Sequence, residues 1–441
     1  MATTITPTIV TVNTAVVLAP QPTQLQQSGA IVSTGGTTLT AGTYQYCGSL
    51  SAVNAIAATP LALTSLIWSS GTVTATASAT LVQSVGQTFL VTIAGAVPAA
   101  YNGTYTATVA TTTTFTFAVA TNPGTETTPG TYTPGDSAFV QQAATVFFAQ
   151  GTSVGVYVLE LGPEATAAAA ITALQTWITG NMQPQVFYAY LVPQSWDTGS
   201  SAALNTLASG YSSPTGKTYF FISTTSTNIS AYTNKACFCV VPAPTAPTTE
   251  ITAAAFFYQW LVNSPSAASP VPPMAWRFLY DVTPWAQTTA NNTTINTVLT
   301  AFGNIVLTGA EGGLPTTSCI FKGTTMDGNQ AIFWYAVDWI QIQAKLLLAN
   351  AVLNGSNSNP PLYYNQGGIN SLLSVLQGVG TSGIAFGLIL SATFTATPFA
   401  TYVAQNPANY AAGIYGGFAC VATPQLGFLS ITFNLEATQI A

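Results

Sequence analysis

The sequence predicts a multi-domain protein of the α/β class (α+β overall). We expect a βαβ core, an inserted all-β domain and extended strand arms at the two ends. Three observations lead to this prediction. The length of 441 residues suggests about three domains. Runs typical of strands and helices alternate through residues 136–289. Both ends of the chain, residues 1–28 and 426–441, contain strand-like runs.

The two ends show the period-two alternation of half-buried strands. The apolar positions of the first are Val10, Val12, Val16 and Leu18, and those of the second are Leu429, Ile431, Phe433 and Leu435. We therefore predict a terminal strand arm over residues 1–28 and another over 426–441. The first ten residues lack the basic and apolar regions of a secretory signal.

Residues 71–135 are predicted to form the all-β insert. Runs such as "TVTATASATLVQ" and "TTTTFTFAVAT" alternate over short stretches, and "TNPGTETTPGTYTPGD" closes the segment with Pro-Gly turns. Asn102-Gly103 lies between two such runs, where this pair favours a type I′ hairpin. The insert would divide the core domain into residues 29–70 and 136–289.

The core should contain a largely parallel sheet. "VGVYVLELG", "QVFYAYLVP", "TYFFIST", "ACFCVVPAP" and "AWRFLYDVTP" read as strands, and helical stretches separate most of them. Such alternation is typical of βαβ units. A further domain is predicted over residues 290–425, with a long helix over 331–353 and another in "GGINSLLSVLQGVGTSG".

The composition limits the function. Charged residues make up 4% of the chain, against about 25% in ordinary globular proteins, and so few charges favour association between copies. Five basic residues and a net charge of −6 argue against nucleic-acid binding. His is absent, which removes the usual general base and metal ligand. The five cysteines are scattered, so we predict buried thiols, with no metal and no cofactor.

Two motifs are weak signals of chemistry. Gly216-Lys217-Thr218 is similar to a phosphate loop, but Tyr211 stands where the spacing needs Gly, and a strand rather than a helix follows. We predict a turn there. Glu160 and Glu164 could form the carboxylate pair of a glycosidase, although coincidence and solvent exposure explain them better. The sequence does not predict an enzyme.

The long helix carries unusual charges. Asp338, Gln341 and Lys345 lie at i, i+3 and i+7, so they share one narrow stripe of an otherwise apolar helix. The stripe either meets solvent above a core helix or meets a second protein, with its charges setting the register. Charges in mid-segment disfavour a membrane span, and we predict no stable membrane insertion.

Several segments together resemble the tail sheath proteins of contractile-tailed bacteriophages, in particular a divergent sheath-like family of myophages. They are the Gly323-Thr324-Thr325-x-Asp327-Gly328 turn, "AVDWIQIQAKLLLAN", "YNQGGINSLLSVLQ", "DSAFVQQAATVFFAQG" and "IVTVNTAVVLAPQPTQLQQSGAIVST". The resemblance covers most of the chain outside residues 71–135. That insert resembles small β modules of phage virion proteins.

The resemblance implies a structural role in the virion, with assembly in the host cytoplasm. Sheath subunits stack as hexameric rings into a helical, contractile tube around the tail tube protein, and they meet baseplate and tail terminator proteins at its ends. Their terminal arms add strands to the sheets of neighbouring copies. The helix with Asp338, Gln341 and Lys345 would face the tail tube, and the all-β insert would lie on the outer surface.

Other readings stay open. One is another structural phage protein, such as a tail tube, capsid-decoration or surface-layer protein, although a tail tube would be mostly β. Another is a carbohydrate-binding adhesin, whose binding would depend on the β insert and its aromatic residues. An enzyme is the last.

Overall fold

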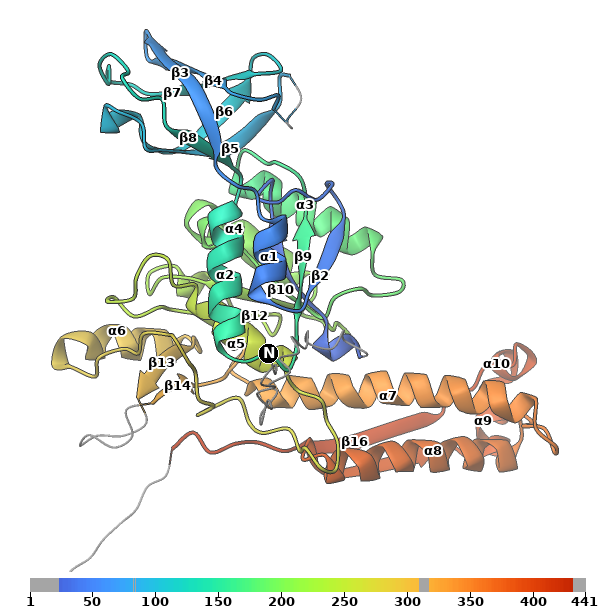
Figure 1. The fold of residues 1–441 in the computed structure, drawn as a ribbon. Coiled ribbons are helices and arrows are strands. Elements are labelled where there is room, and N and C mark those ends of the chain that lie inside the picture. Colours follow the sequence, from blue (N-terminus) through green and yellow to red (C-terminus); the bar gives the residue numbers. More distant parts are fainter. Residues whose placement is uncertain (1–23, 82, 84, 309–316, 431–441) are drawn as a thin grey trace, which may run out of the picture.

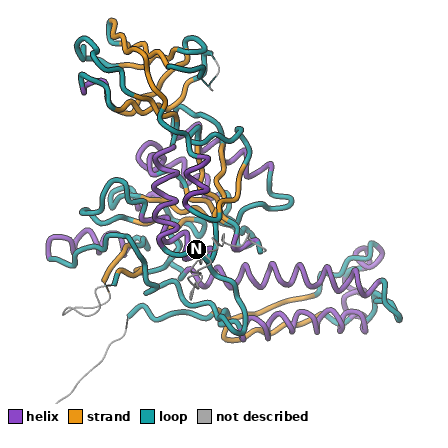
Figure 2. The backbone as a smooth tube through the Cα atoms, viewed as in Figure 1, coloured by secondary structure: helices purple, strands orange, loops and turns teal. Residues whose placement is uncertain are grey.

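The computed structural model describes residues 24–308, except 82 and 84, and residues 317–430 (Figure 1). Within them an α/β domain lies at the centre, with a small β-barrel at one end and a long helical projection at the other (Figures 1 and 2). The mixed α/β architecture predicted from the sequence is confirmed.

The central sheet has six strands in the order β12-β11-β10-β1-β9-β2. The strands are β1 (Gly29–Ser33), β2 (Tyr44–Cys47), β9 (Val156–Glu160), β10 (Ala189–Leu191), β11 (Tyr219–Ser223) and β12 (Cys237–Val240). All pairs are parallel except β2 with β9. β1 lies between β9 and β10, which follow it in the chain, so the connections cover both faces of the sheet in a doubly wound arrangement.

Helices cover the two faces of this sheet. One layer consists of α1 (Leu50–Ile56), α2 (Ser137–Ala149) and α5 (Thr252–Leu261), and the other of α3 (Ala167–Gly180) and α4 (Gln194–Ser209). Successive residues of one strand enter opposite layers: Ile31 packs with the first, and Ala30 and Val32 with the second. Because both faces are covered, β1, β11 and β12 are buried along their whole length.

The β insert is a closed barrel in the order β3-β4-β7-β6-β5-β8. Its strands are β3 (Leu61–Ser69), β4 (Thr72–Ala77), β5 (Thr88–Ala94), β6 (Gly103–Val109), β7 (Thr114–Ala118) and β8 (Thr131–Pro134). Apolar residues such as Val73, Phe89 and Phe115 fill the interior, while Thr residues dominate the outer face. The barrel begins at Leu61, so the expected boundary at residue 71 is wrong. The alternating pattern of β3 is compatible with the central sheet and with the barrel, so the sequence alone could not assign this strand to one of them.

The type I′ hairpin turn expected at Asn102-Gly103 does not form. β5 and β6 do form an antiparallel pair, but residues 95–102 connect them, including the 3₁₀ turn η2 (Ala99–Tyr101). Asn102 has an extended backbone, with φ −74° and ψ 139°, instead of the positive φ of a type I′ turn. Its side chain accepts a hydrogen bond from Ala96 N at 2.9 Å and donates one to Ala96 O at 3.0 Å, which closes the longer loop.

The last third of the chain is built differently. α6 (Thr289–Thr300) precedes a two-stranded sheet of β13 (Ile305–Thr308) and β14 (Ser318–Phe321). α7 (Ala331–Ser356), α8 (Gln366–Ala385), β15 (Ile389–Ala396), α9 (Phe399–Gln405), α10 (Pro407–Ala411) and β16 (Phe418–Pro424) follow. We call residues 331–424 the helical arm, because α7 and α8 lie side by side and project from the core (Figure 1). Two further 3₁₀ turns are η1 (Leu25–Gln27) and η3 (Ile229–Ala231).

The strand expected in "AWRFLYDVTP" does not form as predicted. Residues 275–284 contain one isolated bridge, Phe278 to Cys319. Trp276 and Asp281 have positive φ angles of 65° and 51°, which interrupt regular pairing on either side of it. The carboxamide of Gln150 takes the place of a neighbouring strand, since it donates to Tyr280 O at 2.6 Å and accepts from Tyr280 N at 3.0 Å.

Candidate functional site: the helical arm and its root

The first half of α7 is anchored in the core, and the second half leaves it. Ile332, Tyr335 and Trp339 are buried in the same apolar layer as α2 and α5. Beyond residue 344 most side chains of the helix are exposed, among them Leu346 and Leu353. We call the buried first half the root of the arm. No helix in the described parts of the chain has the length and hydropathy of a membrane span.

Asp338 lies at this root and is fully buried. Its Oδ2 accepts hydrogen bonds from Tyr188 Oη at 2.9 Å and from Tyr219 Oη at 2.8 Å; Tyr188 immediately precedes β10, and Tyr219 is the first residue of β11. Its Oδ1 is buried without a partner. Burial raises the pKa of Asp338 to about 6, while Lys235 and the two tyrosines oppose the shift. The carboxylate therefore ties the arm to the central sheet at an electrostatic cost.

Lys235 is the nearby buried cation. Its Nζ donates to Gly216 O at 2.5 Å and lies 4.8 Å from the ring centre of Trp334, on the first turn of α7. Burial lowers the pKa of Lys235, and the charges of Asp338 and Asp327 work against that shift. A carbonyl and an aromatic face thus solvate this ammonium group.

Asp327, in the loop just before α7, is a second contact point at the root. Its carboxylate accepts from Trp334 Nε1 at 2.8 Å, from Thr325 Oγ1 at 2.6 Å and from both nitrogens of Asn329. The turn over residues 323–328, one of the segments that resemble sheath proteins, therefore leads into α7. The carboxylate of Asp327 within this turn holds it together through these hydrogen bonds. These contacts fix the direction in which the helix starts.

The structure separates the three predicted residues of the stripe. Asp338 is buried, so its assignment to an exposed, tube-facing stripe is wrong for this chain. Gln341 is half-buried, and its Oε1 lies buried without a donor, one turn after Asp338. Lys345 is exposed. A helix that crosses from the core into solvent changes its surroundings along its length, so positions sharing one face need not share one environment.

The predicted terminal strands lie almost entirely outside the described residues. This applies to Val10, Val12, Val16, Leu18, Ile431, Phe433 and Leu435. Leu429 is half-buried and is not in a strand. The chain before it is fixed to the root, because the side-chain amide of Gln330 makes two hydrogen bonds of 2.9 Å with the backbone of Gly427.

β15 and β16 form an antiparallel sheet along α8 (Figure 1). One face packs on the arm through Ile389 and Phe394, which are buried. The other is exposed, with Leu390 59% and Val421 76% accessible. Within the described residues this sheet has two strands, so the outer edge of each lacks a partner strand. Exposed edges of this kind accept an added strand readily.

Glu160, one of the two carboxylates considered for a glycosidase pair, makes hydrogen bonds within the fold. Glu160 is buried at the end of β9, and its oxygens accept from Gly35 N at 2.6 Å, Gly162 N at 2.8 Å and the hydroxyl groups of Ser33 and Thr37. The main-chain N–H groups after β1 are thus occupied by the protein's own acid. Burial raises the pKa of Glu160. The carboxylate closes the loop that follows β1.

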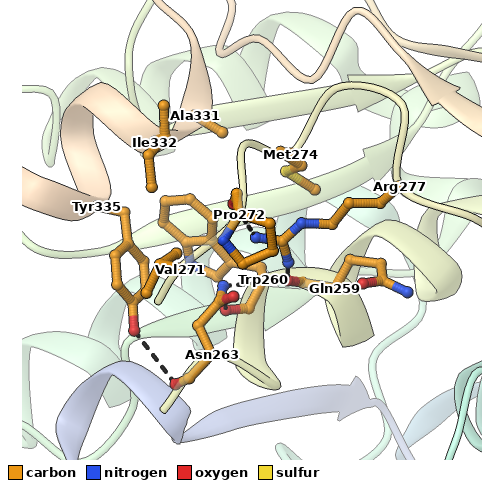
Figure 3. Close-up of a pocket in the computed structure, with 10 residues that line it drawn as sticks. All are labelled: Gln259, Trp260, Asn263, Val271, Pro272, Met274, Arg277, Ala331, Ile332 and Tyr335. Atoms are coloured by element: carbon orange, nitrogen blue, oxygen red, sulfur yellow. Dashed lines mark hydrogen bonds between the residues drawn. The ribbon is translucent and has the colours of Figure 1, made fainter. Parts of the chain in front are cut away.

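The Gly216-Lys217-Thr218 motif lies in the loop before β11, as predicted. A small pocket of about 10 Å³ lies between α5 and α7, beside Trp260 and Arg277 (Figure 3). This is room for about one water molecule. The Arg277 guanidinium donates to the carbonyl groups of Gln259, Pro272 and Pro273. No cluster of potential metal ligands occurs among the residues whose positions are described.

The sequence did not identify Tyr188, Tyr219 and Lys235 as the residues that surround Asp338. Tyr188 and Tyr219 precede Asp338 by 150 and 119 residues, so no local pattern connects them. The only available signal was the rarity of charge on an apolar helix. A buried charge needs polar partners, and that rule alone would have predicted some hydroxyl or amide partner in the sheet.

No family model matches the sequence, and no curated protein does. Among solved structures, a chain of the cryo-EM structure of the anti-feeding prophage baseplate, 6-fold symmetrised, matches with a TM-score of 0.54 and 10% identity over 100% of both chains. A sheath tail protein from Listeria innocua matches with a TM-score of 0.43 and 10% identity, over 92% of this chain and 96% of that one. The first similarity shows the fold: this chain is folded like a chain of that baseplate.

Proposed function

We propose that this chain is a structural subunit of a contractile phage tail, of the sheath type. It polymerises into hexameric rings stacked helically around the tail tube. Contraction would proceed by a shift between two arrangements of subunit interfaces, without nucleotide hydrolysis. The fold shared with the baseplate chain supports this class of protein.

The β15–β16 sheet is the observation that carries the proposal. It is exposed, its two outer edges lack partner strands in the described structure, and it lies on a projection away from the core. The alternating segments with Val10, Val12, Val16 and Leu18, and with Leu429, Ile431, Phe433 and Leu435, supply strands of suitable chemistry. Added to these edges in neighbouring copies, they would link subunits through main-chain hydrogen bonds.

The tail tube, baseplate and tail terminator proteins are the further partners that we propose. Asp338 no longer belongs to the tube-facing set, since it is buried. Lys345, at the start of the exposed half of α7, stays the proposed contact toward the tube. The barrel lies at the opposite end of the molecule from the helical arm, so an arm directed inward would place it on the outer surface (Figure 1).

Negative-stain electron microscopy of the purified chain tests the proposal. We expect hollow tubes with a ring repeat, wide enough to enclose a narrower tube. Removing residues 1–23, or residues 431–441, should abolish the tubes while the circular dichroism spectrum stays that of a folded α/β protein. Tubes that persist after both deletions would contradict strand exchange.

A baseplate-type ring protein is the second candidate, because the matching structure is a baseplate. The same micrographs separate the two. A baseplate component should give single closed rings that do not lengthen at high concentration or on a preformed tail tube. A sheath subunit should give stacked rings whose length follows that of the tube.

A further inference from the structure

The helical arm is free of charge over almost all of its length. No Lys, Arg, Asp, Glu or His occurs between Lys345 and Glu436. More than half of the large apolar side chains that are exposed in the described structure lie in this stretch, among them Leu353, Tyr363 and Ile414. An exposed surface that is both apolar and uncharged is typical of a contact with another molecule.

The tip of the arm contains a groove. Its volume is about 350 Å³, and it lies between the end of α7, the start of α8 and the start of β16. The lining is mainly apolar and aromatic, and includes Leu348, Val352, Tyr363, Ile369 and Tyr415. An apolar cavity of roughly 150 Å³ can hold a benzene ring, so this groove has room for an aromatic side chain.

Two exposed apolar side chains lie at the opposite end of the arm. Leu426 is 51% and Phe428 is 78% accessible. Both are fixed at the root, since Gly427 between them is bonded to Gln330 and the Phe428 carbonyl accepts a hydrogen bond from Trp276 Nε1 at 3.0 Å. Val352 follows Gln330 by 22 positions of helix, about 33 Å along its axis at 1.5 Å per residue. This pair therefore cannot fill the groove of its own chain.

We propose that the groove at the arm tip binds Leu426 and Phe428 of a second copy of this chain. A charged partner would lose its hydration against this surface without gaining a counter-charge, and the apolar lining favours an apolar side chain, so the occupant that fits is apolar and uncharged. The two residues at the root meet that requirement. Groove and occupant lie at opposite ends of one arm, so the contact is head-to-tail and repeats from copy to copy, as a ring or filament requires. This deepens the proposed function by naming what the arm tip contacts.

The test uses two full-length variants that each damage one half of the contact. Val352→Asp puts a carboxylate in the groove, and Phe428→Asp removes the occupant's ring and adds a charge. Both positions are exposed in the single chain, so neither change should unfold it. Asn350→Asp is the control, because it adds the same charge about 200° around the helix from Val352.

Sedimentation velocity gives the masses. We expect the wild-type chain and Asn350→Asp to form large oligomers that persist between about 0.05 and 1 M salt. Either damaging variant alone should associate at least about a hundredfold more weakly, because its carboxylate would be buried unpaired. Mixed in equal amounts after removal of residues 1–23 and 431–441, which takes away the proposed strand exchange, they should give dimers and nothing larger, since one intact groove and one intact root remain. A wild-type chain that stays monomeric, variants that assemble normally, or a mixture without dimers would overturn the proposal.

The contact between the groove and Leu426 with Phe428 can be tested separately from the sheath assignment. A chain without residues 1–23 and 431–441 keeps the groove and Leu426 with Phe428, but it lacks the terminal strands. If that chain forms head-to-tail oligomers and the full chain forms no tubes, the contact stands and the sheath assignment is wrong. If the full chain forms tubes that Val352→Asp leaves intact, the opposite holds.

Discussion

Tyr219 Oη in β11 donates a hydrogen bond of 2.8 Å to Asp338 Oδ2 in α7. The bond joins the central sheet to the root of the helical arm, inside a layer of aromatic side chains. Trp260 lies 5.0 Å from Tyr219 and 5.3 Å from Tyr335, measured between ring centres. Because Asp338 lies on α7 and Tyr219 on β11, a movement of α7 relative to the sheet would break this bond, so the bond stabilises the observed direction of the arm.

The first prediction concerns pH. The pKa of Asp338 is raised to about 6 in the folded chain, so the folded state binds the proton more tightly than the unfolded state. Its contribution to the free energy of unfolding should be greatest below about pH 4 and should fall as the pH rises to about 6.5, by roughly 3 kcal/mol at most. Asp338→Asn should reduce this fall and be more stable than the wild-type chain at pH 7.

Urea unfolding at one protein concentration, at several pH values, checks this. Asp136, whose pKa burial also raises to about 6, is present in both proteins, so the difference between them isolates Asp338. Identical pH profiles of the two proteins would show that Asp338 does not carry the effect.

The second prediction concerns the two tyrosines. Tyr219→Phe and Tyr188→Phe should each destabilise the chain by about 1–3 kcal/mol at pH 7, because each leaves the buried carboxylate with one donor fewer. In the Asp338→Asn background the same changes should cost less, since a neutral group loses less. A double-mutant cycle measures the coupling. Tyr363→Phe, at a 62% exposed site, is the control and should change stability little. Equal costs in both backgrounds would argue against coupling through the carboxylate.

The extent of α7 was predictable, but its role along its length was not. An apolar run without Gly or Pro predicts a helix from Ala331, and the structure has one over Ala331–Ser356. Outside one narrow polar stripe the run is apolar along its whole length, so the pattern could not show that half of it is buried and half projects. The partners of Asp338 are Tyr188, just before β10, and Tyr219, in β11; both lie more than 100 residues earlier, and only the fold brings them to Asp338.

The central sheet was predictable because buried parallel strands are continuous apolar runs between helices. β11 and β12 lie within the predicted runs "TYFFIST" and "ACFCVVPAP". The segment with Trp276 and Asp281 shows the limit. Its composition is strand-like, yet two non-glycine residues with positive φ interrupt it. Tertiary contacts impose such conformations, and the neighbouring sequence does not predict them.

The third prediction concerns the joint between sheet and barrel. Gly135 has φ +61°, and a Cβ there would lie 2.3 Å from the carbonyl carbon of Gly35. Gly135→Ala should destabilise the chain by about 3 kcal/mol or more, because backbone must move as well as adopt a strained φ. Gly42→Ala is the matched control, with φ +80° and no atom within 4 Å of the new Cβ. It should cost about 1 kcal/mol. Thermal unfolding compares them, and equal losses would show that the contact with Gly35 is unimportant.

The last prediction separates the barrel from assembly. The two chain segments that connect it to the core meet directly, since Ser137 Oγ donates to Ala58 O at 2.5 Å. A chain in which Pro60 is joined to Gly135, without residues 61–134, should therefore keep the fold of the α/β domain. The helical arm lies at the other end of the molecule, so this chain should still form tubes under the electron microscope (Figure 1). An adhesin would instead lose binding to a glycan array on the same deletion. Folded but unassembled protein would show that the barrel takes part in subunit contacts and would count against its place on the outer surface.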